Sequence, residues 1–281
     1  MENNFDDLKD FIKRSYDSNK MKLVKRKKIV IITMNLLSII CLIIGGIGLK
    51  SIYDYKEDFS NTEDLQSSIK KYKPVVDDSK SLVNENVTED DKDIANLNYK
   101  SFQELLKINS DTVGWLKIKG TDIDMPIVKT VDNNYYLSHN FNKEISSLGW
   151  GFMDYRNSVT SLDKNTILYG HTYKNTLIFS SLSNVLKSNW LNNDSYHTIV
   201  FNTLYSVQNW QVFSVYTEEK NSYFTKMQFE DEMFEQYLNN IKNKSIKDFG
   251  VELDGEDKII TISTCYIDTN HRLIVHAKLI K

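Results

Sequence analysis

KIITISTC at residues 258–265, followed after six residues by RLIVHAKLI at residues 272–280, is the stretch that decides the fold of this chain. β-branched and aliphatic residues fill both runs, and the residues between them include Asp268 and other turn formers, so the pattern predicts two strands joined by a turn. In such a hairpin Cys265 ends the first strand and Arg272 begins the second, so a thiol and a permanently charged guanidinium lie opposite each other. A neighbouring cation favours the thiolate, the nucleophilic form of cysteine.

Two interpretations of Cys265 are open from its type alone. A free cysteine is often a small buried hydrophobe with no chemical role. Cys265, however, stands at the polar end of an apolar strand, after Ser263 and Thr264, and the only other cysteine is Cys41 in an apolar N-terminal segment. If the region after that segment is exported, Cys265 has no disulfide partner in this chain, and a thiol kept unpaired there favours chemistry.

A nucleophilic thiol needs a partner that accepts and donates protons, and the chain has five histidines. His171 has the best setting because it ends the apolar run NTILYGH, a predicted strand stopped by Gly170. His276 lies inside the last predicted strand, where a role on the sheet face is the simpler interpretation. His271 falls in the hairpin turn, and neither of the remaining two has a strand-end setting: His139 and His197.

The N-terminal part carries a predicted membrane anchor. Residues 29–49 contain no charged residue, and 21 residues are enough to cross a hydrocarbon core of about 30 Å as a helix. Lysines and an arginine cluster just before this run, so residues 1–28, which also fit a short amphipathic helix, are expected in the cytoplasm. Residues 50–97 are acidic and predict a helix over 52–72 followed by a flexible extracellular tether. The folded domain is expected at 98–281.

The folded domain reads as mostly β. After a predicted helix at 99–108, short apolar runs separated by turn residues predict strands at 113–118, 123–128, 151–154, 166–171, 198–201 and 206–216, before the terminal hairpin. This spacing is typical of a closed sheet or barrel. Two helical patterns interrupt it, at 177–186 and at 228–241, the second with an apolar stripe suited to packing on the barrel.

Four ordered sequence blocks resemble the sortase family. TISTC with a downstream arginine and an upstream LYGHT resembles the sortase signature of a cysteine, an arginine and a histidine on a separate strand. The runs DTVGWLKIKGTDIDMPIVKTVDNNYYLSHNF, LGWGFMDYRN and NTILYGHTYKNTLIFSSL are similar to class B sortases, so the resemblance spans about residues 98–281. It departs from the family at Trp150, which is bulkier than expected and is predicted to reshape the nearby surface.

The resemblance implies a closed β-barrel of about eight strands, with an N-terminal helix and a helix between the penultimate strands, preceded by one transmembrane helix. It also implies a membrane-anchored cysteine transpeptidase, a thiol protease of the EC 3.4.22 class from Gram-positive bacteria. Such an enzyme cuts the C-terminal sorting signal of an exported protein, of the NPxTN or SPxTG type, after threonine. It then joins the protein to a peptidoglycan amine of the cell wall.

The site residues follow from the same resemblance. It makes His171, Cys265 and Arg272 the expected catalytic residues, and it places substrate binding at Ser263, Thr264 and Tyr266 and along the segment 228–241. By analogy with catalytic triads Asp268 could be a third catalytic residue, but the simpler interpretation is an aspartate that only stabilises the turn. No metal or organic cofactor is implied. A net charge of -3 and the lack of a phosphate-binding loop argue against a nucleic-acid partner.

Three alternatives remain open. A pilin-polymerising class C sortase would transfer to a lysine of another pilin, but the sequence shows neither a hydrophobic tail after Lys281 nor a lid with an aromatic residue before the barrel. An L,D-transpeptidase also uses cysteine, histidine and arginine, although its cysteine typically follows Ser-His-Gly. A non-catalytic module tethered to the membrane would hold Cys265 buried and inert.

Overall fold

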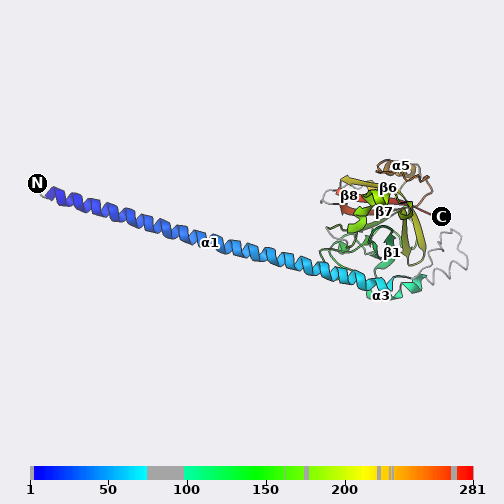
Figure 1. Cartoon of the computed structure of the whole chain (residues 1–281), viewed down its shortest axis with the longest axis horizontal. Coiled ribbons are helices and arrows are strands. Elements are labelled where there is room, and N and C mark those ends of the chain that lie inside the picture. Colours follow the sequence, from blue (N-terminus) through cyan, green and yellow to red (C-terminus); the bar gives the residue numbers. More distant parts are fainter. Residues whose placement is uncertain are drawn as a thin grey trace. The chain divides into compact units, whose positions relative to one another are not determined.

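The computed structural model describes residues 3–74, 98–161, 163–173, 177–219, 223–227, 229, 231–266 and 271–280 (Figure 1). The chain forms two compact units, Met1–Glu57 and Asp58–Lys281. The elements in chain order are α1 (Asn3–Ile69), η1 (Lys70–Tyr72), α3 (Gln103–Ile108), β1 (Thr112–Ile118), β2 (Asp124–Val128), η2 (Tyr135–Leu137), β3 (Phe152–Met153), β4 (Asn165–Gly170), η3 (Ser180–Leu186), α4 (Ser188–Leu191), η4 (Asp194–Tyr196), β5 (Thr198–Thr203), β6 (Val207–Glu219), η5 (Tyr223–Thr225), α5 (Asp231–Asn243), β7 (Ile259–Tyr266) and β8 (His271–Leu279).

The helix α1 is continuous where the sequence predicted separate helices. It runs unbroken through residues 29–49, and Gly45, Gly46 and Gly48 do not interrupt it. Each glycine makes the free energy of helix formation only about 1 kcal/mol less favourable than alanine would, so three glycines in a long helix do not end it. Its apolar part has a mean hydropathy of 2.5 over 18 residues, so by length and composition this helix can cross a membrane.

The eight strands form a closed barrel in the order β1-β2-β3-β4-β7-β8-β6-β5. This confirms the mostly β architecture predicted from the sequence. Six neighbouring pairs are antiparallel, whereas β2 with β3 and β4 with β7 are parallel. Parallel neighbours end at the same edge of a sheet, so the C-terminal ends of β4 and β7 meet. That shared edge is where His171 and Cys265 lie.

Successive residues of β7 and β8 point alternately to the two faces of the sheet, and each face contributes to an apolar core. Ile260 and Ile262 of β7 lie in the main core inside the barrel. Ile259 of β7 and Ile274 of β8 lie in a second core on the outside, where α5 covers the sheet with Phe234, Tyr237, Leu238 and Ile241 (Figure 1). Of the apolar stripe that the sequence predicted for the helix at 228–241, Tyr237 and Ile241 are buried against the barrel and Phe229 packs on the same core, whereas Met233 is exposed.

The last part of α1, which lies within the helix predicted at 52–72, packs against the barrel. Ile69 is buried in the main core, and Phe59, Leu65 and Tyr72 pack against that core. Lys73 follows with an ion pair to Asp124 at 2.7 Å. The acidic segment 75–97, where a tether is predicted from the sequence, lies outside the described residues.

Two local predictions were wrong. Trp150 does not reshape the surface, because its side chain is completely buried, packs on Phe141 and donates its indole N–H to the Pro126 carbonyl at 2.9 Å. The helix predicted at 177–186 is a 3₁₀ helix from Ser180 to Leu186. It starts after Ile178, whose φ of +53° is incompatible with a regular helix at that point.

Gly170 is required where β4 ends. A Cβ atom at this position would lie 2.5 Å from the Cγ atom of Phe179, whose ring is completely buried. We expect Gly170→Ala to lower the free energy of unfolding by about 1–3 kcal/mol, the usual cost of overpacking a filled core. Urea unfolding followed by tryptophan fluorescence measures this, because all four tryptophans are buried in the barrel unit.

Gly255→Ala is the matched control for this substitution. A Cβ atom at Gly255 meets no atom within 4 Å, so this variant should unfold at the same urea concentration as the parent chain. Equal midpoints for Gly170→Ala and Gly255→Ala would show that the Phe179 ring moves aside without cost.

Candidate active site

The strand register places the three predicted catalytic residues beside one another. In the parallel pair β4–β7, Gly170 is opposite Thr264, so the next residues along the two strands are His171 and Cys265. In the antiparallel pair β7–β8, Cys265 is opposite Arg272. These three positions therefore follow one another across β4, β7 and β8 at one edge of the barrel.

Two of the predicted positions are only partly described, and a third is not described at all. The backbone of Cys265 and Tyr266 forms the end of β7, but their side chains lie outside the described residues, as does all of Asp268. Ser263 and Thr264 are both buried. The Thr264 hydroxyl is in close contact with that of Thr172, whereas the buried Ser263 hydroxyl has no hydrogen-bond partner in the part of the chain that the structure describes.

His171 is held by a backbone carbonyl and an aromatic ring. Its Nε2 atom lies 3.2 Å from the Leu137 carbonyl oxygen, and its ring lies beside that of Tyr173, with centroids 5.7 Å apart. Because a carbonyl can only accept, Nε2 carries the proton in the neutral ring and Nδ1 keeps a free lone pair. Burial and then the charge of Arg272 lower the pKa of His171, so the neutral imidazole dominates at neutral pH.

Arg272 continues the row towards β6. It is half-buried, and its cross-strand neighbour on the other side is Glu218. Glu218 forms an ion pair with Lys244, which follows α5. Neither Glu218 nor Lys244 was predicted from the sequence, because nothing in the local pattern of β6 indicates that its end lies beside the hairpin.

The buried carboxylate of Asp154 binds Tyr169, which lies on β4 two residues before His171. Asp154 is completely buried, and its oxygens accept hydrogen bonds from the Arg156 guanidinium at 2.7 and 2.8 Å and from Asn133 at 3.0 Å. The hydroxyl of Tyr169, opposite Ser263 in the register, donates to it at 2.9 Å. Burial alone raises the pKa of Asp154, but these bonds outweigh it and the net pKa is lowered. The motif DYRN in the sequence could have signalled this cluster.

Asn165 at the start of β4 anchors the connection between β6 and α5. Its amide nitrogen donates to the carbonyls of Lys226 at 2.9 Å and Phe224 at 3.3 Å. Its amide oxygen accepts the Thr261 hydroxyl at 2.7 Å. The segment that leads into α5 is thus bound to the strand that ends at His171.

The other histidines have structural settings. His276 is completely buried, with its ring nitrogens 2.9 Å from the Thr261 hydroxyl and 3.1 Å from the Tyr216 hydroxyl. Burial and the charge of Lys244 lower the pKa of His276 to about 3, so this ring stays neutral. His139 stacks on Tyr135 and His197 is buried beside Trp190. His271 opens β8 opposite Tyr266.

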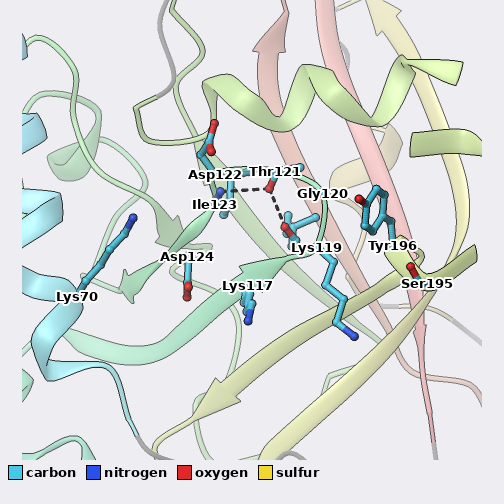
Figure 2. A pocket seen from close by; sticks show the side chains of 11 residues that line it. Lys70, Lys117, Lys119, Gly120, Thr121, Asp122, Ile123, Asp124, Ser195 and Tyr196 are labelled. Atoms are coloured by element: carbon cyan, nitrogen blue, oxygen red, sulfur yellow. Dashed lines mark hydrogen bonds between the residues drawn. The ribbon is translucent and has the colours of Figure 1, made fainter. Parts of the chain in front are cut away.

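A separate hollow of about 450 Å³ lies at the turn between β1 and β2 (Figure 2). The Thr121 hydroxyl closes that turn by donating to the Ile118 carbonyl and accepting the Ile123 N–H. The charged residues that line the hollow are Lys70, Lys117, Lys119, Asp122 and Asp124. None of the predicted site residues lines it, and it offers no nucleophilic thiol. Among the described residues, no three acidic, histidine or cysteine side chains form a metal-binding group.

Comparisons with known proteins agree with this geometry. The profile of a family described as Sortase domain matches residues 116–280. Sortase B of Listeria monocytogenes is 34% identical over 215 residues, which cover 73% of this chain and 84% of that protein. Sortase B of Staphylococcus aureus is 31% identical over 262 residues, which cover 92% and 99%. The crystal structure of sortase B from Bacillus anthracis in complex with AAEK1 is 31% identical, with a TM-score of 0.66 and coverage of 80% and 99%.

Proposed function

This chain belongs to the class B sortases, which are cysteine transpeptidases, and from that premise we propose that it cleaves a sorting signal after threonine and transfers the protein to a peptidoglycan amine. The observation that carries the proposal is the register that brings His171, Cys265 and Arg272 to adjacent positions on three neighbouring strands. These residue types supply a proton carrier, a nucleophile and a fixed positive charge.

In the first half-reaction, Cys265 is the nucleophile. Nδ1 of neutral His171 takes the thiol proton, and the sulfur attacks the carbonyl carbon of the threonine in the signal. Arg272 stabilises the negative charge that develops on the carbonyl oxygen. The C–N bond then breaks, His171 gives its proton to the leaving amine, and a thioester to Cys265 remains.

In the second half-reaction, an amine of the peptidoglycan attacks the thioester. His171 takes a proton from the attacking nitrogen, a new amide C–N bond forms and the C–S bond breaks. The proton returns to the sulfur, so the enzyme is restored. When no amine is present, water can take its place and release the free acid.

The peptide groove lies on the outer face of β4 and β7. Ser263 supports this assignment, because its buried hydroxyl has no hydrogen-bond partner among the described residues and can bond a substrate backbone. Thr264 and Tyr266 border the same strand end, and the segment leading into α5 forms one wall. The signal is of the NPxTN or SPxTG type.

The N-terminal part of α1 anchors the enzyme. Residues 29–49 cross the cell membrane once, with the basic residues 1–28 in the cytoplasm and the catalytic domain outside. The exported partners are proteins with a C-terminal sorting signal. The support is the apolar stretch of α1 and the cluster of lysines that precedes it.

A peptide panel tests the function. The purified full chain in detergent micelles is incubated with fluorogenic peptides carrying NPxTN, SPxTG and LPxTG signals, with and without triglycine, and the products are identified by mass. We expect cleavage after threonine in one of the first two, and a product joined to triglycine when it is present. Cleavage of none, together with a Cys265 that resists alkylation, would favour a binding module with an inert thiol.

A further inference from the structure

Hydrogen bonds connect the barrel end of α1 with the ring beside His171. A carboxylate oxygen of Asp58 accepts both the backbone N–H of Ser147 at 2.7 Å and its hydroxyl at 2.6 Å. The carbonyl of the same Ser147 accepts the hydroxyl of Tyr173, whose ring packs on His171. Asp58 is charged and half-buried, so these bonds are stronger than neutral ones.

A second contact from α1 reaches the other end of the segment that carries His171. The side-chain oxygen of Gln66 lies within hydrogen-bond range of the Ile178 N–H, at 3.4 Å. The next residue, Phe179, donates its N–H to the carbonyl of His171 at 3.3 Å. The helix therefore contacts Ile178 of this segment directly and reaches Tyr173 through Ser147.

The loop that contains Ser147 also supplies the carbonyl that holds the imidazole. Leu137, the acceptor for Nε2 of His171, stands at the start of this loop. The loop is closed by backbone hydrogen bonds from Ser146 to Ser138 and from Trp150 to Tyr136. Because the loop is closed in this way, a shift of Ser147 also moves the Leu137 carbonyl.

We propose that Asp58 is a positioning residue for His171. This inference rests on the proposed function in that it takes His171 as the proton carrier. Asp58 fixes Ser147, Ser147 fixes Tyr173 and the loop from Leu137, and these two hold the imidazole. The imidazole is thereby held with Nε2 on the Leu137 carbonyl, which leaves Nδ1 for the proton transfer.

Steady-state kinetics of the full chain in detergent micelles test the proposal. Asp58→Ala should lower kcat roughly tenfold or more at a nearly unchanged KM, because a small misplacement of a catalytic group is costly and Asp58 is outside the peptide groove. Asp58→Asn keeps an oxygen that can accept both bonds, so most of the activity should return. Asp64→Ala is the matched control, since Asp64 is exposed on the same helix and should leave kcat unchanged.

The imidazole resonances of His171 give a readout that needs no turnover. With histidines labelled in ¹³C, the His171 signal is identified by its absence in His171→Gln. It should move in Asp58→Ala and in Tyr173→Phe, which removes only the hydroxyl, and it should not move in Asp64→Ala. This comparison decides the proposal even if no peptide is cleaved and the proposed function fails.

Two results would overturn the role of Asp58. The first is a His171 resonance and a kcat that are the same in Asp58→Ala and Asp64→Ala. The second is an unmoved His171 resonance in Tyr173→Phe, which also decides the case if Asp58→Ala does not fold.

Discussion

Cys265→Ala should abolish peptide cleavage, with a loss on the order of 10⁴-fold or more, because removing the nucleophile leaves no route to the thioester. The fold should survive, since Cys265 is the penultimate residue of β7 and alanine leaves the backbone pairing of that strand with β8 unchanged. The measurement is the rate of product formation from the cleaved peptide, together with the mass of the enzyme after a brief incubation. The parent chain should gain the mass of the acyl fragment and the variant should not.

Cys41→Ala is the control for this substitution. It removes the only other cysteine of the chain, which lies in the apolar part of α1, and should leave cleavage and acylation intact. Cleavage retained by Cys265→Ala at the parent rate would exclude the thioester mechanism and, with it, the proposed role of the cysteine.

The fold could be predicted where strands that follow each other in the sequence also pair with each other. The terminal hairpin is made of apolar, β-branched runs around a short polar turn, and the structure pairs Cys265 with Arg272 as that pattern requires. The other predicted strands match β1 to β6 to within a few residues, because short apolar runs between turn residues are a direct signal of strands. The spacing of these runs also indicated a closed sheet or barrel, and the resemblance to class B sortases added the expected number of about eight strands.

The parallel pairing of β4 with β7 could not be derived from pattern alone. A chain segment that includes β5, β6 and α5 separates the two strands, and no local rule says which strands become neighbours after such an excursion. The adjacency of His171 and Cys265 depends on this pairing. Only the resemblance pointed to it before the structure did.

The supporting contacts were missed for a related reason. Asp58 bonds to Ser147 and Asn165 bonds to Lys226, and in each case a polar side chain meets a group far away in sequence. A single aspartate on a helix or asparagine at a strand start looks like any solvated polar residue. Its partner is set by how the elements pack, which a local pattern does not contain.

Asp154→Ala should produce the largest loss of stability among substitutions outside the cores. Asp154 is completely buried, and its removal strips the charged partner from Arg156 and leaves the hydroxyl of Tyr169 without its acceptor. Breaking a buried ion pair on one side costs about 3–5 kcal/mol, here lessened because Arg156 is partly exposed. Urea unfolding followed by tryptophan fluorescence gives the free energy directly.

The pH dependence of the free energy of unfolding distinguishes the effect of the Asp154 charge from the effect of its hydrogen-bond geometry. The pKa of Asp154 is lowered in the folded chain, so its stabilising effect is complete above the unfolded pKa of about 3.9 and is lost as the pH falls through the lower folded value. Asp154→Asn has no charge to lose, so the gap in stability between parent and variant should be constant above about pH 5 and narrow below about pH 4. A gap that stays the same down to the acid limit would mean that Asp154 acts by hydrogen-bond geometry alone. Tyr169 lies opposite Ser263, so in that case the cluster would still shape the groove without its charge mattering.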